Sequence, residues 1–409
     1  MNLHSRLDAH ALPPIDRNAW VEVDLDQLSA NAATLSALAR ADELGGVVKA
    51  DGYGHGLELA ARAFVRGGAR WLCVAMMGEA RRLRTDGYEG PIFVLYPVPP
   101  HELSEARVQR IDVTVGRQHQ VDDVVAESAG RQPALRVHLE VDTGMTRGGI
   151  APDDAAGAAA ALAAADGVEL VGVWSHLAAP EEPAVASRQE AAFRAVLAGI
   201  AAEGIDVPVT HLAASGGLLS TALGTFALAR VGLTLYGENP LPDTPLPAGV
   251  APALAVKAEP VRVAEVPAGT GVGYGGDWVA QRPSVIATLP LGYADGWARA
   301  SSPGTSVLVR GRRAPVVGRV SSDATTVDVT DVDGVGPDDE FVLLGAQGDD
   351  RVTADEVAGV RHTISWEVLQ QLGARLPRVY TSAGRPVAVR TTSSTTVSGA
   401  SDDLTDPYR

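Results

Sequence analysis

Short apolar runs alternate with stretches of helical composition through the first half of the chain. The runs are rich in β-branched residues, which favours buried strands, and eight of them end near Lys49, Ala75, Tyr96, Val115, Val141, Trp174, Ala213 and Val231. Helix-sized segments separate them, such as residues 57–66, 78–85, 153–165 and 184–202. Strands that alternate with helices predict a parallel α/β sheet, and eight of them match a closed (β/α)₈ TIM-type barrel. A doubly wound open sheet is the alternative.

The pattern changes after about residue 250, where helical periods become scarce. Apolar runs separated by Gly, Pro and Asp predict a mainly antiparallel β domain, with strands at 261–266, 284–289, 306–309, 314–320, 325–329 and 341–344. Helices are expected near 353–357 and 365–372. We therefore expect a barrel over 18–250 and a β domain over 251–390. The early run at 20–23 is free to pair with the β domain, because the barrel can be built without it.

Both ends of the chain are predicted to be flexible tails. Residues 1–17 show no apolar period and contain Pro13 and Pro14, and residues 391–409 are rich in Ser, Thr and Asp. Neither segment offers enough apolar surface to offset the entropy of ordering.

Composition narrows the class of protein. The 409 residues carry 34 Lys and Arg against 50 Asp and Glu, a formal charge of −16, which argues against nucleic acid as a partner. Cys73 is the only cysteine, so no intramolecular disulfide or Cys-rich zinc site is possible. No signal peptide, membrane-length apolar run or metal-ligand spacing is present. We expect a cytoplasmic protein with no membrane partner and no metal.

Candidate chemistry lies where the barrel strands end, because active sites of such barrels lie at that edge. The first strand ends in Lys49, within a run that contains three glycines over the next seven residues. A partly buried lysine loses some preference for its charged form and can form a Schiff base, although a lysine that merely reaches solvent from a strand end is the alternative. Later strand ends carry Arg147, His176, Ser215, Arg230, Gly232 and Leu233. A Schiff-base lysine beside a phosphate-binding rim suggests pyridoxal 5′-phosphate.

These residues stand in motifs that resemble those of alanine racemases. The run VVKADGYGHG at 47–56 is similar to the family's lysine motif, and the resemblance extends from about residue 20 to 380. It includes HLEVDTGMTRGG at 138–149, GVWSHLA at 172–178, ARVGLTLYG at 229–237, GVGYGGDW at 271–278, LGYADGW at 291–297, APVVGRVSSD at 314–323 and RLPRVY at 375–380. The resemblance implies a pyridoxal-phosphate isomerase acting on an amino acid, with alanine favoured, and a homodimer in which the β domain completes the partner subunit's site.

The resemblance also implies roles for single residues. Lys49 and Tyr274 of the other subunit would be the two catalytic bases, with His176 and Arg230 beside the cofactor ring. The cofactor-binding set would be Lys49, Tyr53, Ser215, Arg230, Gly232, Leu233 and Trp366, and the substrate-binding set would be Arg147, Ser322, Asp323 and Tyr293. Two bases on opposite faces of Cα can remove a proton from one side and deliver one to the other.

Four positions depart from the usual family pattern. Glu140 stands where many members have a carbamylated lysine, and it is expected to support Arg147 with the same charge on a shorter arm. Ala214 replaces an Asn, Ser322 a Met and Trp366 a Tyr. These departures put the substrate in question more than the cofactor. A racemase, epimerase or decarboxylase of the same fold acting on another amino acid is the main alternative. A non-catalytic pyridoxal-phosphate carrier and a metal-dependent aldolase are weaker ones.

Overall fold

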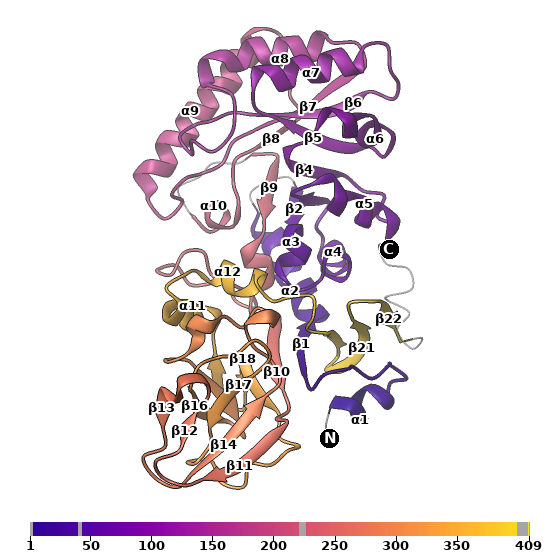
Figure 1. Cartoon of the computed structure of the whole chain (residues 1–409). Helices are drawn as coiled ribbons and strands as arrows, with labels where there is room; N and C mark the ends of the chain where they lie inside the picture. Colours follow the sequence, from indigo (N-terminus) through magenta and orange to yellow (C-terminus); the bar gives the residue numbers. More distant parts are fainter. Residues whose placement is uncertain (1–2, 40–42, 221–225, 399–407, 409) are drawn as a thin grey trace. The chain divides into compact units, whose positions relative to one another are not determined.

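The computed structural model describes residues 3–39, 43–220, 226–398 and 408. The chain divides into two compact units (Figure 1). Residues 28–52 and 57–251 make up most of one, here called the barrel unit. Residues up to 27, 53–56 and 252–406 make up the other, here called the β unit. The division at 251/252 lies one residue from the predicted boundary.

The barrel unit contains, within its described residues, one sheet of eight strands in the order β8-β7-β6-β5-β4-β3-β2-β9. All neighbours in this order are parallel. The two end strands, β8 and β9, share no ladder of paired residues, but a backbone hydrogen bond links β9 to the segment that follows β8. There the backbone N–H of Arg230 donates to the carbonyl of Ala213 at 2.9 Å. The sheet therefore curves into a nearly closed barrel, and the open-sheet alternative is wrong. The strands are β2 (Glu43–Val47), β3 (Trp71–Val74), β4 (Ile92–Pro97), β5 (Ile111–Val115), β6 (Leu135–Glu140), β7 (Val168–Trp174), β8 (Val209–His211) and β9 (Leu228–Val231).

Helices follow the strands because the intervening segments carry one apolar face. In α4 (Leu57–Arg66), Leu57, Ala60, Ala61 and Phe64 are buried while Arg66 is exposed. Figure 1 shows α7, α8 and α9 outside the strands. The remaining helices of this unit are α2 (Leu25–Leu38), α3 (Lys49–Tyr53), α5 (Met77–Thr85), α6 (Leu103–Val108), α7 (Gln118–Ser128), α8 (Ala155–Ala164), α9 (Pro183–Ala202) and α10 (Ser215–Leu219), with 3₁₀ turns η1 (Pro100–Glu102), η2 (Pro152–Asp154) and η3 (Leu233–Tyr236).

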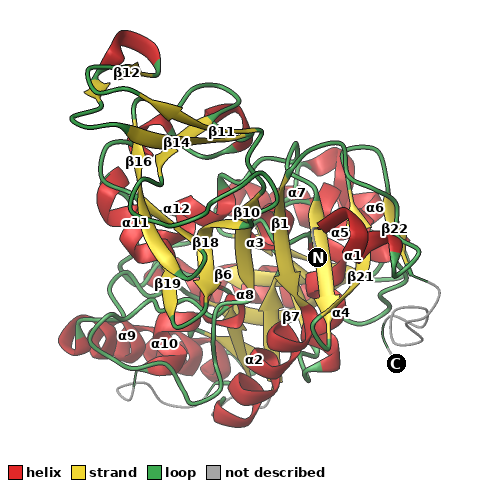
Figure 2. Ribbon diagram, turned by 90° about the horizontal axis from the view of Figure 1, so that it is seen from below, coloured by secondary structure: helices red, strands yellow, loops and turns green. Residues whose placement is uncertain are grey.

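The β unit is built on one large, mainly antiparallel sheet (Figure 2). Its strand order is β11-β14-β17-β16-β15-β18-β10-β1-β20-β21-β22, with β19 on β18. The early strand β1 (Ala19–Asp24) lies inside it, antiparallel to β10 and parallel to β20. The other strands are β10 (Leu254–Ala258), β11 (Arg262–Val266), β14 (Ser284–Leu289), β15 (Ser306–Val309), β16 (Arg312–Val317), β17 (Thr325–Asp328), β18 (Phe341–Gln347), β19 (Asp350–Val352), β20 (Arg378–Ser382), β21 (Arg385–Arg390) and β22 (Thr395–Val397).

Shorter elements complete this unit and carry several candidate residues. They are the hairpin β12 (Gly271–Val272) and β13 (Trp278–Val279), the helices α11 (Ala354–Arg361) and α12 (Ser365–Gln370), and the 3₁₀ turns η4 (Tyr274–Gly276), η5 (Tyr293–Asp295) and η6 (Arg299–Ser301). Among the residues that the structure describes in either unit, no helix is both long and apolar enough to span a membrane.

The prediction of a flexible tail over residues 1–17 is wrong for the described part. Residues 3–8 form α1 (Leu3–Asp8), and Leu3, Leu7, Leu12 and Ile15 are buried in a cluster with Trp20, Val379 and Val389. The spacing of Leu3 and Leu7 places both on one helical face, a signal too short to stand out as a period. At the other end, β22 pairs with β21, so the predicted tail is ordered at 395–397. Residues 399–407 and 409 lie outside the described residues.

Candidate active site

Lys49 opens a turn of unusual handedness directly after β2. Ala50, Asp51 and Gly52 have φ of 52°, 55° and 61°, so three successive residues adopt the left-handed region that L-amino acids avoid. A left-handed residue other than glycine costs about 1–2 kcal/mol, so surrounding contacts must hold the turn. The backbone N–H of Gly52 donates to the Val48 carbonyl at 2.8 Å. This geometry fixes the point from which the lysine side chain leaves the barrel rim.

Glu79 provides one of those contacts, and the sequence pattern did not predict it. Its buried carboxylate accepts the backbone N–H of Ala50 at 2.7 Å, and those of Ala75 and Met76 at 2.8 and 3.3 Å. One acidic side chain thereby ties the start of α5 to the residue after Lys49. A glutamate at the third position of a helix is the sequence signal, but that pattern reports a helix start and not a neighbouring strand.

Lys49 is half-buried, and its environment favours the neutral amine. Burial lowers the pKa of its ammonium group, the positive charge of Arg147 lowers it further, and Glu79 partly offsets both. A neutral lysine is the form that attacks an aldehyde or accepts a proton. The pKa of Lys49 is therefore lowered, which is the direction expected for a partly buried lysine at a strand end.

Arg230, on β9, is buried and heavily contacted. Its guanidinium donates to the carbonyl of Ser175 and to Nδ1 of His211, both at 2.8 Å, and to Nδ1 of His176 at 3.3 Å. It also stacks 4.7 Å above the Trp174 ring. Burial lowers the pKa of Arg230 to about 10, which still leaves it charged at neutral pH. The structure thus brings Arg230 and His176 together, as predicted.

His176 follows β7 and is held neutral. Burial and the positive charges of Arg230, Arg147 and Lys49 lower its pKa to about 3. Gln189, which is buried on α9, orders this loop: its Oε1 accepts the N–H of Ala178 at 2.8 Å and its Nε2 donates to the His176 carbonyl at 3.1 Å. An imidazole that stays neutral at pH 7 can donate through one nitrogen and accept through the other.

The loops after β8 and β9 meet at Ser215. Its buried hydroxyl accepts the backbone N–H groups of Gly232 at 3.1 Å and Thr234 at 3.3 Å. Leu233 lies between them at the start of η3 and is buried. This corner joins Ser215, Gly232 and Leu233, as the sequence predicts for a phosphate-binding rim of a barrel.

Glu140 ends β6 and lies beside glycines. Its carboxylate is buried next to Gly148, where an added Cβ would come within 2.9 Å of Oε2. Burial raises the pKa of Glu140, while Arg147 and Arg230 pull it back down. Within the described residues no ion pair joins Glu140 to Arg147, and Arg147 is exposed. The expected support is therefore electrostatic rather than a direct contact.

The other predicted site residues belong to the β unit. Tyr274, on η4, is 70% exposed, and Tyr293, on η5, is 50% exposed. Trp366 on α12 is half-buried. Tyr53 is buried, and burial raises the pKa of its phenol to about 12, so it is a hydrogen-bonding group and not a base.

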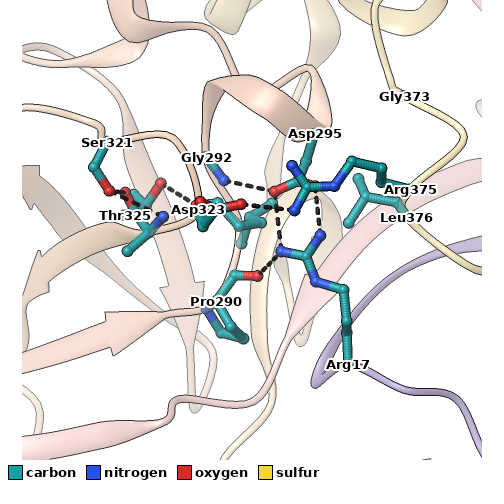
Figure 3. Close-up of polar contacts among 12 residues, drawn as sticks. Arg17, Pro290, Gly292, Asp295, Ser321, Asp323, Thr325, Gly373, Arg375 and Leu376 are labelled. Carbon is teal, nitrogen blue, oxygen red and sulfur yellow. Dashed lines mark hydrogen bonds and ion pairs between the residues drawn. The ribbon is translucent and has the colours of Figure 1, made fainter.

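A buried carboxylate organises the turns that carry Tyr293, Ser322 and Asp323 (Figure 3). Asp295 accepts from Arg17 at 2.5 and 3.0 Å and from the N–H of Gly292 at 3.0 Å. Arg375 bridges Asp295 to Asp323, at 3.5 and 2.6 Å. The N–H groups of residues 293 and 294 donate to the carbonyls of residues 321 and 322. Three predicted substrate residues are thus fixed to one polar cluster.

Comparisons with known proteins agree over both units. The family model of the alanine racemase N-terminal domain matches residues 23–240, and that of the C-terminal domain matches residues 253–380. An alanine racemase of Thermobifida fusca is 40% identical over 373 residues, which cover 90% of this chain and 99% of that protein.

Solved structures give the same result. The alanine racemase of Bacillus anthracis with bound L-Ala-P superposes with a TM-score of 0.87 at 32% identity, covering 93% of this chain and 99% of that one. The alanine racemase from D-cycloserine-producing Streptomyces lavendulae has a TM-score of 0.84 at 37% identity, covering 90% and 98%.

Proposed function

Because this chain belongs to the alanine racemase family of pyridoxal-phosphate-dependent isomerases, we propose that it interconverts L- and D-alanine. The observation that carries the proposal is the set of barrel-rim groups: a half-buried Lys49 with a lowered pKa, a buried Arg230, and the neutral His176 between cationic neighbours. The cationic groups of Lys49, Arg147 and Arg230 all act on His176, and such a set suits an anionic cofactor.

The donor set fits pyridoxal phosphate chemically. Lys49 offers the amine that would hold the aldehyde carbon. Arg230 offers N–H groups to a ring nitrogen, and as a guanidinium it holds its own proton firmly. Ser215 and the amides of Gly232 and Leu233 would bind the phosphate, with Tyr53 and Trp366 proposed as further partners from the β unit. When bound, the cofactor supplies an electron sink that makes the substrate α-proton acidic.

The chain's own residues would then move protons. A neutral Lys49 accepts a proton from one face of Cα, and Tyr274 of the partner subunit serves the other face. Tyr274 is 70% exposed and stands on the short turn η4, so its hydroxyl is available to a second copy of the chain. This exposure supports a homodimer with shared sites. Arg230 disfavours full protonation of the ring nitrogen, which restrains side reactions.

The choice of alanine rests on the absence of any new charged group near the substrate residues. Arg147 would bind the carboxylate, with Ser322, Asp323 and Tyr293 around it. Ser322 is smaller than the Met of the family pattern, and Trp366 is larger than the Tyr, so the two changes affect the volume around the substrate in opposite directions. One methylene in an apolar pocket is worth about 1–3 kcal/mol, so a racemase for another small amino acid is the second candidate.

The test is α-proton exchange in D₂O across a panel of amino acids, with chiral analysis of each product. We expect alanine to give the highest kcat/KM and deuterated product of both hands. If another amino acid exceeds alanine by tenfold or more, which corresponds to about 1.4 kcal/mol, the alanine assignment is wrong. Decarboxylated product would contradict racemisation itself.

A further inference from the structure

A row of buried polar side chains crosses the interior of the barrel unit behind Arg230. Arg136 donates to both oxygens of Asp112, at 2.7 and 3.2 Å. Asp112 Oδ2 lies 3.1 Å from Nε2 of His138. Nδ1 of His138 lies 2.9 Å from Nε2 of His211, and Nδ1 of His211 lies 2.8 Å from Nη1 of Arg230. Asp112, His138 and His211 are fully buried.

Only one placement of protons satisfies this row. A carboxylate is acceptor-only, so His138 must carry its proton on Nε2 and leave Nδ1 bare. The bare Nδ1 of His138 must then accept from Nε2 of His211, which leaves Nδ1 of His211 bare. That nitrogen accepts from Arg230, which has no acceptor of its own. Every link runs from Arg230 toward Asp112, and a reversal of any one imidazole would place two donors face to face at under 3 Å.

Asp112 is kept as an anion by its own neighbours. Burial alone would raise its pKa, but the hydrogen bond from His138 and the hydrogen bonds and charge of Arg136 lower it overall. His138 and His211 stay neutral, because burial lowers the pKa of both. The protons in the row are therefore fixed and not exchanged along it at neutral pH.

The backbone makes room for this row. Gly172 lies in β7, and a Cβ at this position would collide with Nδ1 of His138 and with the carbonyl of Val209. Rings of Phe93 and Trp174 pack against the two imidazoles, with Trp174 stacked on His211 at 5.9 Å and 13°. Packing and hydrogen bonding thus point to a defined geometry for both rings.

We propose that Asp112 is a positioning residue for the reaction: through the tautomers of His138 and His211, it orients the Arg230 guanidinium. The inference rests on the proposed function only for the role of Arg230 at the cofactor. Its consequence reaches His176, whose Nδ1 accepts from Nη2 of Arg230 at 3.3 Å. The proton of neutral His176 then sits on Nε2, so that nitrogen is a donor. A donor stabilises the phenolate form of a tyrosine presented to it, which is the form that acts as a base.

The first test reads the tautomers directly in the holoenzyme. Protein with ¹⁵N-labelled histidine is studied by NMR, and His138 and His211 are assigned by single replacement with Gln. We expect both rings to show a protonated Nε2 and a bare Nδ1. A protonated Nδ1 on either ring in the wild-type protein overturns the proposal, whatever the enzyme's substrate.

The second test uses Asp112→Asn, which keeps the size but gives the side chain a donor as well as an acceptor. Its matched control is Glu169→Gln, because Glu169 accepts from the same Arg136 at 2.9 Å on the exposed side and makes no hydrogen bond to Asp112, His138 or His211. We expect Asp112→Asn to shift the ring-nitrogen resonances of His138, because a neutral amide is a weaker acceptor than a carboxylate for its Nε2–H. We also expect it to lower kcat/KM about 10–100-fold, as replacing the outer partners of metal ligands does. The control should keep the wild-type His138 resonances and the wild-type kcat/KM.

The two readouts separate this inference from the proposed function. A wild-type protein with the expected tautomers but no racemase activity would refute the function and leave the proton arrangement standing. A folded Asp112→Asn protein that keeps wild-type kcat/KM would refute the positioning role. If Asp112→Asn does not fold, Gly172→Ala displaces His138 without changing any member of the row, and it should lower kcat/KM in the same range. Unchanged kinetics in that folded variant would also refute the role.

Discussion

Mild acid should destabilise the folded protein through three histidines of the barrel unit. Burial lowers the pKa of His138, His176 and His211, and for His176 to about 3. In the unfolded chain each has a pKa of about 6.5. Below that value the unfolded state binds protons that the folded state does not. The free energy of unfolding is therefore highest above pH 6.5 and falls as the pH drops toward the folded values.

The size of the effect follows from that difference. Each group that stays neutral in the folded state costs about 1.4 kcal/mol of stability between pH 7.5 and pH 5.5, so the upper bound for the three together is about 4 kcal/mol. That is a large share of a typical stability of about 5–15 kcal/mol. The pH interval from 5.5 to 7.5 lies above the range in which the carboxylates of the unfolded chain titrate. Glu140, whose pKa burial raises, acts in the opposite direction and by at most one proton.

The free energy of unfolding can be measured at each pH between 7.5 and 5.5 by urea titration, with tryptophan fluorescence as the signal. The slope of the unfolding free energy against pH gives the number of protons taken up, and we expect about two to three at pH 5.5. Replacing His211 by Asn should lower that number by about one. A slope equivalent to fewer than one proton would show that these three rings are already protonated in the folded protein at pH 5.5, contrary to the prediction.

Three further predictions concern the rim. Borohydride reduction of the holoenzyme should fix the cofactor to Lys49, and peptide mapping that finds it on another lysine would overturn that assignment. Glu140→Gln should lower kcat/KM by about 0.2–1 kcal/mol, since Glu140 acts on the exposed Arg147 through its charge and not through a hydrogen bond. Wild-type activity should not change on bicarbonate depletion, since a glutamate needs no CO₂. Glu79→Gln leaves one oxygen for three backbone donors, and should displace the Lys49 turn and slow cofactor binding at least tenfold. The matched control Glu58→Gln, whose carboxylate pairs with exposed Arg82, should bind cofactor at the wild-type rate.

Periodicity was sufficient to predict the main elements of both units. The predicted segments 284–289 and 306–309 coincide with β14 and β15, and 57–66 with α4. Alternating strands and helices also predicted the parallel order of the barrel, because each crossover returns the chain to the same edge of the sheet. The prediction of a flexible N-terminal tail was wrong, because the four buried side chains in α1 and the following turn form no regular period.

The polar groups behind the rim could not be predicted from the sequence. Asp112, His138 and His211 stand on three different strands, 26 and 73 residues apart in sequence. In strands buried on both faces, polarity does not alternate, so the sequence pattern does not say which side chains point inward. Glu79 was missed for a related reason, because its contact with Ala50 joins a helix to the end of a neighbouring strand. Residues at strand ends were found because their position alone places them on the rim.

In the proposed dimer, each racemase site contains Lys49 of one subunit and Tyr274 of the other. The most direct measurement is chiral analysis of L-alanine incubated with wild-type protein, with Lys49→Ala, with Tyr274→Phe, and with the two variants mixed after verified subunit exchange. We predict D-alanine from the wild-type protein, little from either variant alone, and recovery of about a quarter of wild-type activity in an equal mixture, since half the dimers then hold one intact site. No D-alanine from the wild-type protein would contradict the racemase activity, and no recovery in the mixture would contradict a site shared between two subunits.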